Sequence, residues 1–285
     1  MRYLGVDVGG TSVKVAAVEG DRILWTGQSF AYARPTREQL IEAIKSAAGG
    51  KAGRADGVGL CVPGLQDKAN RKVILSVNVP GLDNVSLDEL ISTSLGNGVG
   101  RVHIVNDAVA TGTDVFRWKK LSGRLLTIAL GTGVGGGVLD DGVPLMVEGE
   151  SSGHIGQFDV SIEGHPVVGP DGGAGSLEGY MGVAALRQRY GADADINAII
   201  AKWKGDEPPL RALARAIRIA HAVYRPHHVV LAGGIGIRLK HLIPPIRALI
   251  DDRLTSVARE GWTLSAGESD FHAAAGAATV AMRRG

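Results

Sequence analysis

Near the start of the chain, a glycine-rich turn lies between two apolar runs and is flanked by a carboxylate and a hydroxyl. Residues Leu4–Lys14 read Leu-Gly-Val-Asp-Val-Gly-Gly-Thr-Ser-Val-Lys, and the alternation continues through Val15 and Ala17. The P-loop and the dinucleotide fingerprint both need a helix after their glycines. Here the glycines are followed by a strand pattern instead, so the sequence predicts a β-hairpin.

This turn has the groups that would bind a phosphate. We expect Gly9 and Gly10 to adopt φ > 0 and to leave backbone N–H groups free for an anion. Asp7 would serve Mg²⁺, Thr11 offers a hydroxyl to a phosphate oxygen, and Lys14 completes the candidate set. The alternative is an ordinary hairpin with a solvated aspartate.

A second glycine-rich turn occurs in the middle of the chain. Its spacing matches Gly-x-Gly-x-x-Gly, but the flanking segments Leu125–Leu130 and Gly135–Leu139 are apolar strands, which argues against a dinucleotide site. The alternative is a flexible hairpin tip. Together with the first turn, it predicts two phosphate-binding hairpins that face each other across a cleft, as phosphoryl transfer requires. The candidate contacts are Gly131, Thr132 and Gly133.

A candidate general base follows another apolar strand. Val102–Val105 ends in Asn106 and Asp107, and ligands of α/β sheets bind at the carboxyl ends of strands. A carboxylate there could take a proton from an acceptor hydroxyl, worth about 10²- to 10⁴-fold in rate. Alternatively, Asp107 caps the helix that begins at Ala108, and the two roles are compatible.

A third glycine pair ends the apolar strand His228–Ala232 and precedes a helix. Gly233 and Gly234 would let the adenosine part of a nucleotide approach the backbone closely. An ordinary strand-to-helix turn explains the same pattern.

Composition limits the class of protein. The chain has 285 residues, and that length suits two compact lobes or one large α/β domain. A net charge of +2 with scattered charges gives no basic stripe, so no nucleic-acid partner is expected. The single cysteine, Cys61, excludes a thiolate metal cluster and suits a reducing compartment. The first strand starts by residue 2, so no signal peptide is expected. No apolar run is long enough to span a bilayer. We therefore expect a cytoplasmic protein.

The rest of the sequence predicts that the order of strands and helices in the first half is repeated in the second half. After the first hairpin and a third strand at Arg22–Gln28, helix and strand patterns alternate, and a second hairpin then opens the later half. We therefore predict an α/β fold of two duplicated lobes with a cleft between them, residues 1–107 with a returning helix 272–285, and residues 108–271. The predicted helices are Thr36–Ala48, Ser86–Leu95 with a reciprocal Ser86–Glu89 cap, Ala108–Trp118, Leu177–Arg189, Pro209–Tyr224, Ile237–Asp252 and Phe271–Met282.

Taken together, the motifs resemble the ROK family, which comprises repressors, open reading frames and sugar kinases. The matching pieces span nearly the whole chain. They are Asp7–Thr11, Gly59–Gly64, Asn78–Gly81, Asn106–Ala108, Leu130–Gly137 and Leu231–Gly234.

The resemblance implies an actin-like ATPase (ribonuclease H-like) fold and a cytoplasmic carbohydrate kinase that acts as a homodimer. It implies ATP and Mg²⁺ as cofactors, a hexose or amino sugar as acceptor, and Asp107 as the base. The implied sugar contacts are Gly64, Asn78, Asn106, Asp107 and Glu178.

The sequence departs from the family pattern where the family has Gly-Glu-x-Gly-His. Matched without gaps, Gly153–Gln157 places His154 at the sugar-binding glutamate and Gln157 at the zinc-binding histidine; a shifted match would pair Glu150 with His154. His154 could donate to a sugar hydroxyl or be a satisfied loop histidine. The family's cysteine cluster is also replaced, by Gly169, Asp171 and Ser176, so no structural zinc is expected.

Three other functions fit parts of this pattern. A sugar-responsive repressor would need a helix-turn-helix ahead of the first hairpin, where the chain has no room. A non-catalytic sugar sensor would explain the altered Gly153–Gln157 segment. A polyphosphate-dependent glucokinase fits the missing cysteine cluster.

Overall fold

The computed structural model describes residues 1–67, 69–147 and 151–285, and the chain divides into two compact units. Unit 1 comprises Met1–Asp114 and Phe271–Gly285, and unit 2 comprises Val115–Asp270. The first division falls inside helix α3 (Asp107–Trp118), and the second falls just before α10 (His272–Arg284). Within the described ranges, no helix combines the length and apolar character needed to cross a bilayer.

Unit 1 is built on a five-stranded sheet with the order β3-β2-β1-β4-β7. The first three strands form antiparallel hairpins, whereas β1, β4 and β7 run parallel and end at the same edge. The strands are β1 (Arg2–Val8), β2 (Val13–Glu19), β3 (Arg22–Gln28), β4 (Ala55–Cys61) and β7 (Val99–Ile104).

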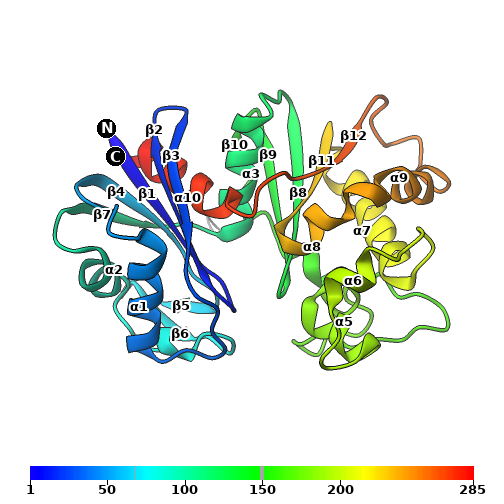
Figure 1. Ribbon diagram of the computed structural model, residues 1–285. Helices are drawn as coiled ribbons and strands as arrows, with labels where there is room; N and C mark the ends of the chain where they lie inside the picture. The colour runs from blue at the N-terminus through cyan, green and yellow to red at the C-terminus, as the bar shows by residue number, and fades with distance from the viewer. Residues whose placement is uncertain (68, 148–150) are drawn as a thin grey trace. The chain divides into compact units, whose positions relative to one another are not determined.

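Helices cover both faces of this sheet (Figure 1). Alternate residues of β1 point to opposite faces. Leu4 and Val6 pack in one core with α1 (Arg37–Ala48) and α2 (Leu87–Leu95), while Gly5 lies against α10.

Of the helices α1 and α2, only α1 has a reciprocal side-chain cap at its N-terminus. The Thr36 side chain and Gln39 cap α1 reciprocally. At α2, the Ser86 hydroxyl accepts the Glu89 N–H at 3.4 Å, but the Glu89 carboxylate accepts from Arg37 at 2.6 Å instead. The predicted reciprocal Ser86–Glu89 cap is therefore only half formed.

Helix α10 packs unusually close to the sheet. A Cβ atom added to Gly5 would lie 1.7 Å from the Ala274 carbonyl oxygen, and one added to Gly59 would lie 2.0 Å from that of Ala277. Only glycine in the strands and small residues in the helix allow this approach. The alanine-rich end of the sequence thus completes unit 1.

Unit 2 repeats the topology of unit 1. Its sheet has the order β10-β9-β8-β11-β12, with β8–β9 antiparallel and β8, β11 and β12 parallel. The central hairpin β1–β2 therefore corresponds to β8–β9, and the predicted duplication is present. The strands are β8 (Arg124–Leu130), β9 (Val134–Asp140), β10 (Val143–Pro144), β11 (His228–Ala232) and β12 (Thr263–Ala266).

Two predicted helices of unit 2 are interrupted. The helix expected over Leu177–Arg189 is split by Gly182, whose extended backbone separates α4 (Leu177–Met181) from α5 (Val183–Tyr190). The prediction of one helix over Ile237–Asp252 is also wrong. Prolines in the first turn of α9 favour the start of a separate helix at Ile243. The observed elements are α8 (Gly233–Arg238), a 3₁₀ turn η3 (Leu239–Leu242) and α9 (Ile243–Asp251).

The other elements are short except for one. The long helix α7 (Pro208–Tyr224) buries one face in the core of unit 2. The short elements are β5 (Leu65–Asp67), β6 (Lys72–Leu75), the 3₁₀ turns η1 (Pro80–Leu82) and η2 (Ile155–Gln157), and α6 (Ile196–Ile200).

Candidate functional site

Three ionisable side chains gather where the parallel strands of unit 1 end. Asp7 on β1 is the register partner of Cys61 on β4. The Val105 N–H, just beyond β7, donates to the Leu60 carbonyl at 2.9 Å, so the chain that leads to Asp107 leaves from the same edge. This is the sheet edge at which the sequence places its candidate base.

The charge of Asp107 contributes to the pKa of Asp7. Burial and the charge of Asp107 raise the pKa of Asp7 to about 6, although Lys14 opposes the shift. Desolvation also raises the pKa of Asp107, although the residue is exposed. Burial and both carboxylates raise the pKa of the Cys61 thiol well above its usual range. Two acids that repel each other make a favourable place for a cation.

Asn106 and Asp107 together cap α3. The Asn106 side-chain oxygen accepts the N–H groups of Ala108 and Val109, each at 3.1 Å, and Asp107 Oδ1 accepts that of Ala108 at 2.7 Å. Asp107 Oδ2 has no hydrogen bond to any residue that the structure describes. The carboxylate is therefore held by one oxygen and free at the other, so capping leaves the base role open.

The first hairpin leaves backbone donors free, but not through the conformation that we expected. The Gly9 N–H closes the turn on the Ser12 carbonyl at 3.0 Å, and the N–H groups of Gly10 and Thr11 have no acceptor among the described residues. Neither Gly9 nor Gly10 adopts positive φ, so that prediction is wrong. At Gly9 the restriction is space, because an added Cβ would lie 3.0 Å from the Ser12 oxygen.

The second hairpin repeats this arrangement in unit 2. The Gly131 N–H donates to the Gly133 carbonyl at 2.9 Å, and the N–H groups of Thr132 and Gly133 have no acceptor in the described part of the chain. The Val134 N–H donates to Glu178 Oε2 at 2.8 Å. Each unit thus ends its central hairpin in a turn with bare donors.

Glu178 supports the second hairpin from α4. Burial raises the pKa of its carboxyl group, and Asp171 adds to the shift. An added Cβ at Gly133 would lie 3.0 Å from Glu178 Oε2, so a larger residue would press on this contact. The second oxygen, Oε1, has no hydrogen-bond partner among the described residues. Glu178 can therefore hold the turn and still contact a ligand.

The glycine pair after β11 has a structural reason of its own. Gly233 has φ +76°, and an added Cβ would lie 2.5 Å from the Leu130 carbonyl oxygen. Gly234 has more space, and its carbonyl accepts a hydrogen bond from Arg238. The turn packs against the end of β8, next to the second hairpin.

The remaining candidates lie on loops. Gly64 has φ +109° and would clash with the Leu75 carbonyl oxygen at 2.4 Å if it carried a Cβ. Asn78 and His154 are exposed, and their side chains have no hydrogen-bond partner among the described residues. Glu150, the alternative match for the sugar-binding glutamate, lies outside those residues.

The positions that replace the family's zinc ligands are close together. Gln157 Nε2 donates to Asp171 Oδ2 at 3.1 Å, and the Ser176 hydroxyl accepts the Gly179 N–H at 3.1 Å. An added Cβ at Gly169 would lie 2.2 Å from the Ser176 hydroxyl. Direct hydrogen bonds therefore hold this loop. No group of three or more histidine, cysteine or acidic side chains able to hold a metal occurs within the described ranges.

One contact to the first hairpin was not predicted. The Tyr32 hydroxyl donates to the Gly9 carbonyl at 2.7 Å. Tyr32 follows β3 in a stretch without helix or strand periodicity, so nothing in the sequence pattern pointed to it.

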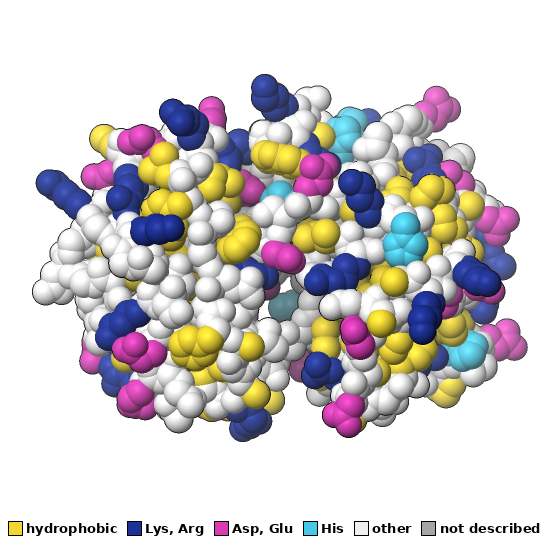
Figure 2. Space-filling view, in the orientation of Figure 1, with side chains coloured by type: hydrophobic (Ala, Val, Ile, Leu, Met, Phe, Trp, Pro, Cys, Tyr) yellow, Lys and Arg dark blue, Asp and Glu magenta, His cyan; other side chains and the backbone are white. Residues whose placement is uncertain are grey.

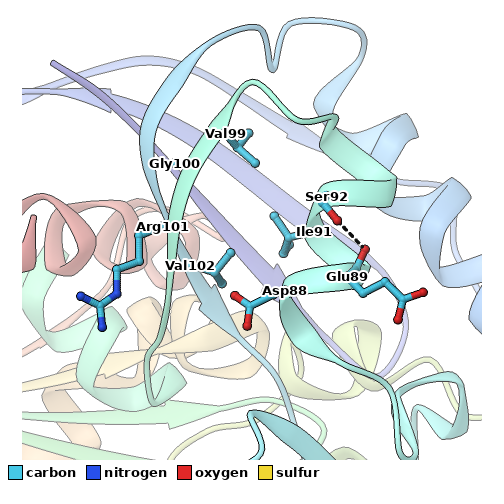
Figure 3. Close-up of a pocket in the computed structure, with 8 residues that line it drawn as sticks. All are labelled: Asp88, Glu89, Ile91, Ser92, Val99, Gly100, Arg101 and Val102. Carbon is cyan, nitrogen blue, oxygen red and sulfur yellow. Dashed lines mark hydrogen bonds between the residues drawn. The ribbon is translucent and has the colours of Figure 1, made fainter.

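A shallow pocket lies away from these groups, between α2 and β7 (Figure 3). Its charged lining includes Asp88, which is bound by Arg71 at 2.6 Å, and Arg101. The space-filling view shows Lys and Arg interspersed with Asp and Glu rather than gathered in a basic stripe on the face drawn (Figure 2). Neither feature competes with the strand-end carboxylates as a site.

The comparisons with known proteins agree with the geometry. The chain is 27% identical to a glucokinase of Thermotoga maritima over 88% of each chain. It is 26% identical to an N-acetyl-D-glucosamine kinase of Erwinia tasmaniensis, over 90% of this chain and 91% of that one. Among solved structures, a ROK family glucokinase from Streptomyces griseus in complex with glucose and AMPPNP matches with a TM-score of 0.72, 23% identity and full coverage of both chains.

The fold is accordingly the duplicated two-lobe fold of the actin-like ATPases that ROK sugar kinases share. The ROK family model itself matches residues 3–284, so it covers both units and the returning helix. The chain belongs to the ROK family.

Proposed function

We propose that this protein is a carbohydrate kinase that transfers the γ-phosphoryl group of ATP to a hydroxyl of a hexose or amino sugar. The observation that carries the proposal is the pair Asp7 and Asp107, which follow β1 and β7 at one edge of the sheet with β4 between them, beside a hairpin whose N–H donors have no acceptor among the described residues. Relatives named glucokinase and N-acetyl-D-glucosamine kinase support this class of acceptor.

The residues present fit Mg²⁺ and a nucleotide. Magnesium in phosphoryl-transfer enzymes is held by one or two carboxylates, with the other ligands from phosphates and water. Asp7, whose pKa is raised beside Asp107, is suited to such an ion because a cation relieves the repulsion. Magnesium bound there would neutralise charge on the phosphates during transfer.

The protein's own groups supply positioning and proton transfer. The N–H groups of Gly10, Thr11, Thr132 and Gly133 donate to phosphate oxygens, and Lys14 adds a positive charge. Asp107, held through Oδ1, uses its free Oδ2 to take the proton from the sugar hydroxyl. The sugar oxygen then forms a bond to the γ-phosphorus as the bond to the ADP oxygen breaks.

The sugar contacts come from several loops. Asn106 lies beside the base, Glu178 Oε1 and His154 have no protein partner among the described residues, and Gly64 and Asn78 complete the proposed set. In the match without gaps, His154 stands where the family places a glutamate. It is therefore the position at which we expect the choice of sugar to differ. Gly233 and Gly234 would receive the adenosine part of the nucleotide.

The test is a kinase assay with Mg-ATP and a panel of hexoses, amino sugars and polyols. We expect ADP release with at least one sugar, and a loss of about 10²- to 10⁴-fold in kcat for Asp107→Asn, since asparagine can keep the contact with the Ala108 N–H but cannot accept the proton. Asp193→Asn, an exposed acid in unit 2, is the control and should retain full activity.

The outcomes separate the alternatives. Turnover with inorganic polyphosphate but not with ATP would show that polyphosphate is the phosphoryl donor. The proposed sugar site and base would stand. Calorimetry that detects sugar binding without turnover would favour a sensor. No turnover with any sugar and either donor would defeat the proposal.

A further inference from the structure

The segment Ser29–Tyr32, which follows β3, closes over the first hairpin. The Tyr32 N–H donates to the Thr11 carbonyl at 2.9 Å, and the Tyr32 hydroxyl donates to the Gly9 carbonyl at 2.7 Å. Ser29 adds two bonds to Val13, one through its N–H and one through its hydroxyl, each at 2.9 Å. Two hydrogen bonds thus hold the turn itself, at Gly9 and Thr11, and two more hold the first residue of β2.

The bond to the Gly9 carbonyl has a particular effect. That carbonyl and the Gly10 N–H belong to the same peptide unit, and the chain has no cis peptide bond in the described ranges. In a trans peptide the C=O and N–H point in opposite directions. A donor that fixes the Gly9 carbonyl therefore aims the Gly10 N–H to the other side, where no described residue accepts it.

A peptide between two glycines needs such a restraint. Glycine has no Cβ to restrict φ and ψ, so the Gly9–Gly10 peptide can rotate at low steric cost. Rotated, it would present a carbonyl oxygen where an anion needs a donor. One external hydrogen bond removes that alternative.

In the second hairpin, a backbone donor restrains the corresponding peptide. The Gly131 carbonyl accepts the Val183 N–H at 3.1 Å, and the Thr132 N–H of the same peptide has no acceptor in the described part of the chain. The two turns follow corresponding strands, β1 and β8. Each therefore restrains the carbonyl of its first glycine, but only in unit 1 is the donor a side chain.

We propose that Tyr32 is a positioning residue for phosphate binding: its hydroxyl fixes the Gly9–Gly10 peptide so that the Gly10 N–H points at the phosphate. The inference rests on the proposed phosphoryl-transfer function. It assigns to Tyr32 no contact with either substrate and no part in proton transfer. Because burial and the charge of Asp7 raise the pKa of Tyr32, the phenol remains a donor throughout the working pH range.

Tyr32→Phe removes the hydroxyl and keeps the ring, which packs against the core of unit 1. We expect the KM for Mg-ATP to rise about two- to twelvefold, the range expected for one lost hydrogen bond, with an unchanged Kd for the sugar. Tyr190→Phe, which removes a hydroxyl from the end of α5, is the matched control and should behave as the unmodified protein. 4-Aminophenylalanine at position 32 restores a donor and should recover nucleotide affinity.

A second readout does not depend on activity. In ¹⁵N-glycine-labelled protein, the Gly10 amide resonance should shift when Mg-AMPPNP is added. In Tyr32→Phe the same resonance should shift less at equal nucleotide concentration and regain its response with the 4-aminophenylalanine protein.

The possible results separate the positioning role of Tyr32 from the proposed kinase function. If the unmodified protein neither binds nor turns over nucleotide, the proposed function fails. If it does both and Tyr32→Phe equals Tyr190→Phe, the positioning role fails. Equal losses for sugar and nucleotide, with a lower melting temperature, would show a structural role and overturn the inference. A Tyr32→Phe protein that does not fold leaves the test to the 4-aminophenylalanine protein, whose nucleotide affinity must then match that of the unmodified protein.

Discussion

At the residue scale, the charge of the site depends on the spacing of two acids. Asp7 has a pKa near 6 because it is buried beside Asp107, and the same environment raises the pKa of the Cys61 thiol. The cysteine is thus an unreactive core residue that separates the two acids along the sheet edge. Because a carboxylate binds a cation only when it is ionised, the raised pKa of Asp7 weakens cation binding at acidic pH.

This coupling predicts a pH-dependent stability. The folded-state pKa of Asp7 exceeds the unfolded value of 3.8, so the native protein binds more protons between about pH 4 and 6. The free energy of unfolding should fall as pH rises through that window, by up to about 3 kcal/mol. Asp7→Asn should lack this contribution and gain stability relative to the unmodified protein from pH 4 to 7.5. Urea unfolding across that range measures the difference, and parallel curves would contradict the assignment.

At the element scale, sequence periodicity predicted most of the structure because most elements bury one regular face. The strands Arg22–Gln28 and His228–Ala232 have the predicted bounds. The predictions fail where tertiary contacts determine the backbone conformation. At Gly182, for example, an extended residue interrupts a helix that the apolar pattern predicts. The short strand Thr263–Ala266 carries too little alternation to be predicted and forms because β11 offers it an edge.

The packing of α10 predicts a large effect from a small substitution. Gly59→Ala would place a Cβ 2.0 Å from the Ala277 carbonyl oxygen, so the helix or the strand must move. We expect a loss of about 1–3 kcal/mol or more in the free energy of unfolding. Gly98→Ala is the control, since its Cβ would meet only ordinary contacts at 3.7 Å. Equal stability of the two variants in denaturant titrations would refute the close approach.

At the scale of the whole molecule, the two units repeat one topology but their candidate sites were not equally predictable. The hairpins and Asp107 stood out because glycines and a strand-end carboxylate form recognisable patterns. Tyr32 did not, because its contact joins residues 23 positions apart through a segment without periodicity. Turn conformation was also beyond the sequence, as the φ values of Gly9 and Gly10 show.

The loop that carries the zinc ligands in other family members predicts a further difference. Here Gln157 bonds directly to Asp171, so the loop should not depend on a metal. A zinc chelator should leave the thermal midpoint unchanged to within about 1 °C, whereas zinc-dependent folds are denatured by chelation. Metal analysis of the purified protein is the companion measurement, and a midpoint lowered by chelator and restored by Zn²⁺ would disprove the prediction.

The place of α10 in the chain has a consequence for biosynthesis. Unit 2 is continuous from Val115 to Asp270, whereas unit 1 needs a helix that the ribosome makes only afterwards. The glycine-lined face of β1 and β4 must therefore wait, uncovered, while some 156 residues of unit 2 are translated. The half of the protein that is synthesised first is the half that finishes folding last.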